Sequence, residues 1–70
     1  MPAAYSAVIQ QQGEWWIGWI EEVPGVNSQG RTREELLACL RDALEEALEM
    51  NRADARAAAT GAYEEVSIPA

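Results

Sequence analysis

The sequence contains no histidine and no lysine, so its five basic residues are all arginine. Nucleophilic catalysis by Ser, Cys or Thr needs a neighbouring base, and no histidine can supply one. The single cysteine, Cys39, excludes an internal disulfide and a cysteine-rich metal site. No apolar run reaches the roughly 18 residues of a membrane span, and residues 1–10 lack a basic secretory start. These absences predict a cytoplasmic protein that is not an enzyme and uses no cofactor, metal or membrane.

Acidic residues dominate the charge. Twelve acids against five bases give a net charge of −7, which argues against nucleic-acid binding because that binding neutralises phosphates with cations. The charge favours a basic partner, although it can also simply keep a small protein soluble. Residues 1–70 make one domain, whose marginal stability would gain from oligomerisation or a partner.

All three tryptophans lie at the start of the stretch 15–32. Alternation predicts a strand over 15–21 that is apolar on both faces. Such a strand is covered on both sides, and one helix covers only one face. The other face is therefore expected to meet a second polypeptide or to remain an exposed interaction patch.

The two faces of this strand and of its neighbour receive different assignments. The side chains assigned to the layer under the helix are Tyr5, Ile9, Trp16, Gly18 and Ile20. The side chains assigned to a protein interface, with a second copy or another partner, are Val8, Trp15, Ile17 and Trp19. Alternation fixes these groups but not which group meets the helix, so the assignments can be exchanged. A tryptophan face can also stack nucleic-acid bases, but the acids that follow the strand favour protein packing.

Turn residues divide the first thirty positions into three strands. Alternation predicts a strand over 5–10, joined by the loop 11–14 to the strand over 15–21. Pro24 and Gly25 have the pattern of a type II turn, and a short third strand follows over 26–29. Gly18 is expected to permit close approach by the helix.

A long helix is predicted over 33–50. Thr32 is its N-cap and Glu35 completes a capping box, and apolar residues recur at helical spacing. Asn51 is expected to end this helix and to cap a short one over 52–59. Cys39, which lies between apolar neighbours in the long helix, is interpreted as a structural thiol.

The alternating segment Tyr63–Ile68 is predicted to be a fourth strand. Because a long helical connection precedes it, parallel pairing beside the first strand is expected. The predicted fold is therefore a two-layer α+β domain with element order β-β-β-α-β. Its sheet order is 3-2-1-4, with one long helix on one face.

The order of the motifs resembles the HicB antitoxins of type II toxin–antitoxin systems. The resemblance rests on Gly13-x-Trp15-Trp16-Ile17-Gly18-Trp19-Ile20, Glu22-Val23-Pro24-Gly25-Val26, Ser28-Gln29-Gly30-x-Thr32-x-Glu34-Glu35 and the Leu/Ala helix, and covers residues 5–50. It implies a truncated ribonuclease-H-like core and a partner of the HicA type, a small basic ribonuclease of double-stranded-RNA-binding fold. An acidic chain would complement such a toxin.

Two features depart from that family's pattern. The family often has a proline where Glu21 stands, and many members continue into a DNA-binding tail. We therefore expect a minimal antitoxin, forming a homodimer or larger homo-oligomer, that does not bind DNA alone. The alternatives are an orphan oligomer without a toxin and a residual metal-dependent nuclease that uses Glu21, Glu22 and Glu65. Ribonuclease H enzymes carry a carboxylate on the first strand, and the stretch 5–10 has none.

Overall fold

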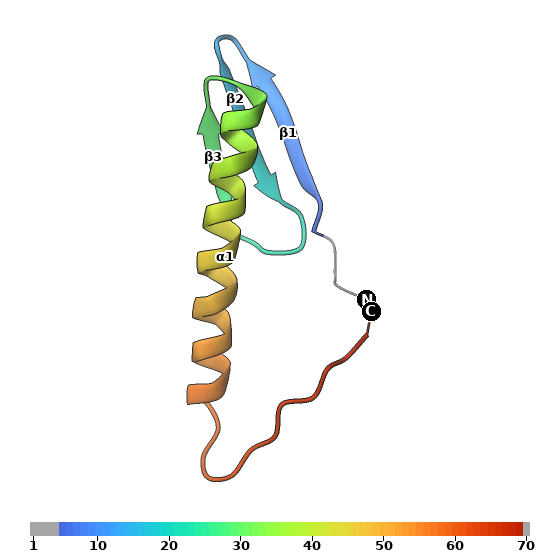
Figure 1. The fold of residues 1–70 in the computed structure, drawn as a ribbon, viewed down its shortest axis with the longest axis vertical. Coiled ribbons are helices and arrows are strands. Elements are labelled where there is room, and N and C mark those ends of the chain that lie inside the picture. Colours follow the sequence, from blue (N-terminus) through green and yellow to red (C-terminus); the bar gives the residue numbers. More distant parts are fainter. Residues whose placement is uncertain (1–4, 70) are drawn as a thin grey trace.

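The structure is a computed structural model that describes residues 5–69, an α+β fold with one long helix on one face of an antiparallel sheet (Figure 1). The strands are β1 (Ala7–Gln12), β2 (Trp15–Ile20) and β3 (Asn27–Gly30), and the helix is α1 (Arg33–Ala57). The sheet order is β1-β2-β3. The predicted adjacency of the first three strands is therefore confirmed.

The hairpin between β1 and β2 is tighter than predicted. Gln11 and Gln12 belong to β1, where they pair with Trp16 and Trp15, so the loop consists of residues 13–14 alone. Gly13 has a φ of +60°, the conformation that a two-residue type II′ turn requires at its first position. β1 begins and ends two residues later than predicted, and a shift of two leaves the alternation of its faces unchanged.

The corner between β2 and β3 has the predicted type II form. Gly25 has a φ of +88°, and the Val26 N–H donates to the Val23 carbonyl at 3.4 Å across Pro24 and Gly25. Both valines are buried, so the corner contributes to the core. β3 starts at Asn27, one residue later than predicted.

The start of α1 has the predicted cap. The Thr32 hydroxyl accepts a hydrogen bond from the Glu35 N–H at 3.0 Å. The Glu35 carboxylate in turn accepts from the Arg31 N–H at 3.2 Å, one residue before the position that a standard capping box uses. These two hydrogen bonds join the residues that follow β3 to the first turn of the helix.

Thr32→Ala is expected to lower the free energy of unfolding by about 1 kcal/mol, because the Glu35 N–H loses its partner. For a domain of this size that loss lowers the melting temperature by about 4–8 °C. Thermal unfolding followed by circular dichroism measures the shift. The control is Thr60→Ala, the same change at an exposed residue beyond α1, and equal melting of the two variants would contradict the cap.

The core lies between α1 and the sheet. Its buried side chains are Ile20, Val23, Val26, Leu36 and Leu40, with Ile9, Trp16, Ala43, Leu44, Ala47 and Leu48 packed around them. Gly18 is also buried, and a Cβ there would lie 3.2 Å from Leu36 Cδ2. The predicted layer under the helix is confirmed for Ile9, Trp16, Gly18 and Ile20.

Tyr5 does not belong to that layer. Its side chain is 40% exposed, and the prediction that it packs under the helix is wrong. The helix lies over β2 and β3, whereas Tyr5 precedes β1 at the far edge of the sheet. Alternation groups Tyr5 with Ile9, but Tyr5 lies outside β1 and the helix does not extend over that part of the chain.

The predicted break at Asn51 is absent, because α1 continues without interruption from Arg33 to Ala57. No glycine or proline occurs within these residues, alanine favours the helix, and Arg52 pairs with Glu49 at 3.7 Å across the position. The continuous helix is about 37 Å long at 1.5 Å per residue. Its second half therefore extends beyond the sheet (Figure 1).

Cys39 is exposed on α1, so its interpretation as a structural thiol is wrong. Its neighbour Leu40 is buried in the core. Successive residues of a helix are about 100° apart around the axis, which places Cys39 outside the covered stripe. Apolar neighbours in sequence do not bury a helical residue.

The predicted fourth strand is also wrong, since Tyr63–Ile68 forms no strand and is exposed. The sheet within residues 5–69 therefore contains the 3-2-1 part of the predicted order without strand 4. The cause is the long helix, which delivers the segment at its far end (Figure 1). Val66 and Ile68 bury little apolar surface there to offset the entropy of ordering.

Candidate protein-binding surface

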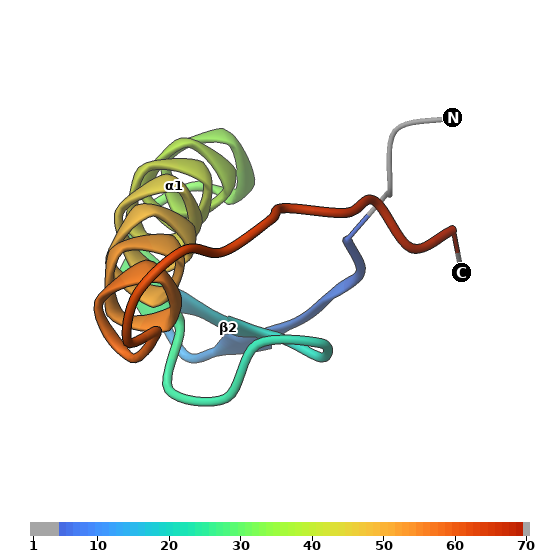
Figure 2. The same cartoon turned by 90° about the horizontal axis from the view of Figure 1, so that it is seen from below.

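The face of the sheet opposite α1 is uncovered by residues 5–69. Figure 2 shows the helix and the C-terminal segment on the other side of the sheet. The strand register places one set of side chains together on the uncovered face: Val8, Gln10, Gln12, Trp15, Ile17, Trp19, Asn27 and Gln29. We call this set the open face.

All four residues predicted to form an interface lie on the open face. Trp15 is 39% and Trp19 42% exposed, which is high for side chains of this size, and Val8 is similarly exposed. Ile17 is half-buried between them. A contiguous apolar patch of this kind marks an interaction site more often than scattered apolar residues do. The role of the four residues as an interface remains a prediction.

The centre of the open face is a column of three apolar residues on β2. Trp15, Ile17 and Trp19 stand two residues apart on the middle strand, and Val8 of β1 is paired directly with Trp19. Amide side chains flank the column, with Gln10 and Gln29 on either side of Ile17. The surface thus combines an apolar centre with a rim that can donate and accept hydrogen bonds.

Arg31 lies at one end of the column. Its guanidinium carbon is 4.6 Å from the centre of the Trp15 ring, a cation–π distance. No local sequence pattern predicts this contact, because 16 positions separate the two residues. The register of β2 and β3 creates it, since Trp16 pairs with Gly30 and their neighbours Trp15 and Arg31 are therefore brought together.

The open face carries no formal charge. None of the residues of β1, β2 or β3 is acidic or basic, although the chain has twelve acids and five bases. Depletion of charged residues distinguishes the centre of protein interfaces from the remaining surface. Apart from Arg31 at its edge, this face can therefore bind through apolar burial and amide hydrogen bonds rather than through ion pairs.

The carboxylates of the rival nuclease site are engaged separately. Glu22 accepts a hydrogen bond from the Ser6 N–H at 2.9 Å, whereas Glu65 pairs with Arg56 at 3.7 Å. Within residues 5–69, no three His, Cys, Asp or Glu side chains are grouped so that they could hold a metal ion. The three predicted ligands Glu21, Glu22 and Glu65 thus form no such group.

The Ser6 N–H lowers the pKa of Glu22 below its ordinary value of 4.5 by favouring the charged carboxylate. The resulting stabilisation is present above the unfolded-state pKa and is lost as the pH falls through the lower folded-state pKa. Glu22→Gln should therefore melt below the wild type at neutral pH, and the difference should vanish in acid. The control is Glu21→Gln, because Glu21 contacts Ser6 through its backbone N–H and this contact does not depend on the side chain. If Glu22→Gln and the wild type differed in melting temperature equally at all pH values, the Ser6–Glu22 hydrogen bond would not be the cause.

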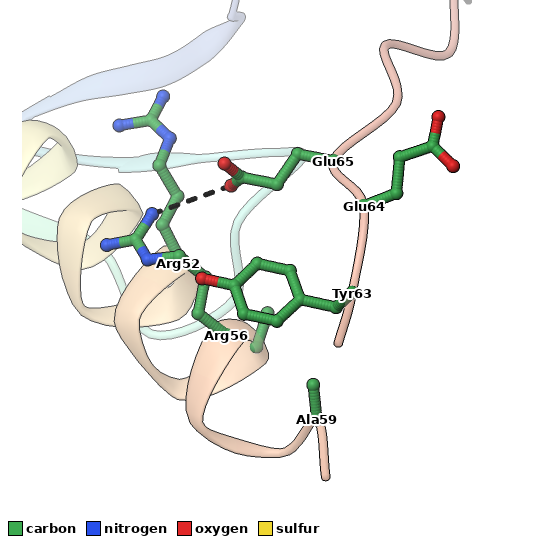
Figure 3. Close-up of a pocket in the computed structure, with 7 residues that line it drawn as sticks. Arg52, Arg56, Ala59, Tyr63, Glu64 and Glu65 are labelled. Atoms are coloured by element: carbon green, nitrogen blue, oxygen red, sulfur yellow. Dashed lines mark ion pairs between the residues drawn. The ribbon is translucent and has the colours of Figure 1, made fainter. Parts of the chain in front are cut away.

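A hollow lies between the end of α1 and the C-terminal segment, with a volume of about 320 Å³. Figure 3 shows Tyr63 pointing from the segment toward Arg52 and Arg56. Arg56 pairs with Glu65 at 3.7 Å and with Glu49 at 3.8 Å. Exposed pairs of this kind contribute about 0–1 kcal/mol. The Arg56–Glu65 pair therefore holds the segment only weakly against the helix, whereas the Arg56–Glu49 pair lies within α1.

Comparisons with models of protein families, with curated proteins and with solved structures found no match to this chain. The resemblance to HicB antitoxins accordingly rests on the motifs of the chain itself. In the part of the chain that the structure describes, no helix has both the length and the apolar character needed to cross a membrane.

Proposed function

We propose that this chain is a non-enzymatic protein-binding module that resembles a HicB antitoxin. It would act in the cytoplasm, where it binds a small basic HicA-type ribonuclease directly and prevents it from cleaving mRNA. The observation that carries the proposal is the separation of two surfaces. The open face is apolar and uncharged, whereas the acidic residues lie on α1, the turns and the C-terminal segment.

The acidic surface supports a basic partner. The net charge of −7 gives a field that attracts cations over several ångströms and raises association rates. Glu34, Glu45 and Glu49 are exposed on α1, away from the core. A ribonuclease that binds RNA through cationic side chains offers the complementary charge.

The element order supports the family assignment. We infer that β1, β2, β3 and α1 correspond to the first four elements of the truncated ribonuclease-H-like HicB fold. β1 reads Ala-Val-Ile-Gln-Gln-Gln and contains no carboxylate. That composition favours a binding protein over a nuclease of the ribonuclease H type, because those enzymes carry a carboxylate on the first strand.

The proposal is tested by adding the purified chain to a HicA-type toxin and measuring cleavage of a labelled RNA. We expect stoichiometric inhibition that weakens at higher salt, because screening shortens the range of the attraction. Two triple variants report the role of charge. Glu45→Gln/Glu46→Gln/Glu49→Gln should inhibit the toxin less than the wild type does. The matched control Arg33→Gln/Arg41→Gln/Arg52→Gln should inhibit it at least as strongly as the wild type.

Other outcomes identify the alternatives. Unchanged cleavage in the presence of excess chain would contradict the antitoxin proposal and favour an orphan oligomer. Magnesium- or manganese-dependent RNA cleavage by the chain alone, abolished by Glu21→Gln, Glu22→Gln or Glu65→Gln, would favour the residual nuclease. The toxin used first should be the product of a short reading frame beside this gene, where the family resemblance predicts a small basic protein.

A further inference from the structure

The absence of charge on the open face indicates what covers it. A basic partner would find no carboxylate among the residues of β1, β2 and β3. The surface is therefore poorly matched to the cationic toxin that the acidic remainder of the chain would attract.

A second copy of the chain matches this face well. In a two-fold contact the same patch serves both partners and must complement itself. An apolar centre with an amide rim does so, because amides donate and accept hydrogen bonds equally. Face-to-face contact also leaves the acids on the outer surfaces of the pair. We propose that two copies pack their open faces together, so that two sheets form the inner layers and the two helices the outer ones.

The size of the face is compatible with such a pair. Three strands of six residues or fewer span about 20 Å along the strands and about 14 Å across them. With side-chain relief, two copies would bury on the order of 1,000 Å² in total, which is the lower limit for a specific interface. Trp15 and Trp19 supply the large aromatic anchors that dominate binding at small interfaces. The geometry points to a reversible dimer that dissociates on dilution.

Pairing would also account for the composition of β2, whose side chains are apolar on both faces. A helix covers the face with Trp16, Gly18 and Ile20, and the partner's sheet would cover the other at the usual spacing of about 10 Å. This inference uses the open face alone and does not depend on the toxin-binding proposal. Acidic surfaces remain free in the dimer for a basic partner.

Light scattering and analytical ultracentrifugation of the full chain, from about 1 µM to about 1 mM, test the pairing over the range of moderate affinities. The wild type should change from a single 7.7 kDa chain to a particle of twice that mass as concentration rises. Trp19→Glu should remain monomeric, whereas Met50→Glu, which places the same charge on an exposed part of α1, should dimerise like the wild type. Circular dichroism verifies that both variants are folded.

A milder variant covers the case in which Trp19→Glu fails to fold. Gln29→Glu changes only one exposed rim amide to a carboxylate and should raise the dissociation constant at least about tenfold, because the two-fold places like charges across a small interface. The effect of salt concentration distinguishes binding of a second copy from binding of a basic toxin. Raising salt from about 0.1 M to about 1 M shortens the screening length from about 10 Å to about 3 Å, which should tighten the dimer and loosen toxin binding.

Three results would overturn the inference. They are a wild type that stays monomeric throughout the concentration range, a dimer that persists in folded Trp19→Glu or has an unchanged dissociation constant in Gln29→Glu, and a dimer that weakens with added salt. A dimer that forms as expected without inhibiting the toxin would contradict only the proposed function. Toxin inhibition by a chain that never dimerises would contradict only the pairing.

Discussion

Leu36→Ala is expected to remove about half or more of the stability of the domain. Leu36 is the one side chain among residues 5–69 with no exposed surface, 0%, and it lies over Gly18, where a Cβ would be 3.2 Å from its Cδ2. Replacing a buried leucine by alanine costs about 2–5 kcal/mol through lost transfer energy and the cavity left behind. A domain of this length has about 4–10 kcal/mol in total.

The surroundings of Leu36 make the upper part of this range the more reasonable expectation. β2 has no side chain at Gly18 that could move into the cavity, and the strand is held by pairing on both sides. We expect a loss of about 4 kcal/mol and a fall in melting temperature of about 16–32 °C, at about 4–8 °C per kcal/mol. Thermal unfolding at one fixed protein concentration measures this fall, because the proposed dimer would add concentration-dependent stability.

Leu37→Ala is the matched control for this prediction. Leu37 is the next residue of α1 but is only half-buried and lies outside the core cluster. The same change there should cost less than about 1 kcal/mol, since alanine is also the better helix former. If the two variants unfolded alike, α1 would not pack on the sheet through Leu36.

Gly30→Ala is expected to destabilise the domain by about 3 kcal/mol through overpacking. A Cβ at Gly30 would lie 2.8 Å from the Leu36 nitrogen and 3.2 Å from the Glu35 carbonyl carbon. Both are backbone atoms of the first turn of α1 and cannot rotate away. The end of β3 and the start of the helix would have to separate, which disturbs the Thr32 cap as well.

The sign of this effect is informative, because alanine at a position with an ordinary φ usually stabilises a protein by about 0.4–1 kcal/mol through the unfolded state. Gly30 is not among the glycines with positive φ, so any destabilisation measures the steric contact alone. Ser28→Ala, on the same strand and the same face, should change the melting temperature little. Stability equal to or above that of the wild type would show that α1 does not approach β3 so closely.

Gly30→Ala also bears on the proposed dimerisation, because it can alter the position of β3 in the sheet. The open face depends on β3 lying beside β2 so that Asn27 and Gln29 flank Trp19 and Ile17. A helix start displaced from Gly30 would move β3 and the stacked Arg31. Loss of dimerisation in folded Gly30→Ala, with the sequence of the open face unchanged, would therefore reflect altered geometry.

Local patterns were sufficient for the parts of the fold that depend on neighbouring residues. Alternation in β2 separated Trp15, Ile17 and Trp19 from Trp16, Gly18 and Ile20 because successive side chains of a strand point to opposite faces. The Thr32 cap and the turn at Pro24-Gly25 are also decided within a few residues, by one hydrogen bond and by the φ preferences of proline and glycine.

Prediction failed where the structure of a segment depends on where a distant part of the chain lies. Asn51 permits a helix end but does not impose one. α1 continues past it because the alanine-rich residues that follow favour a helix and include no glycine or proline before Ala57. That continuation removes the segment Tyr63–Ile68 from the sheet, although its alternation is typical of a strand. Tyr5 shows the same limit, since its face follows from alternation but its exposure depends on where α1 lies.

The sequence by itself determined two opposed faces on β2, a capped amphipathic helix, an acidic surface and strands without charge, because each follows from residue type and from the short repeat of a strand or helix. Only the tertiary structure decided which face α1 covers, how far α1 extends, and that Arg31 stacks on Trp15. The first outcome depends on close contacts at Gly18 and Gly30, where the absence of a side chain lets the helix approach, and the last depends on the register of β2 and β3. Such contacts join residues that no local pattern relates.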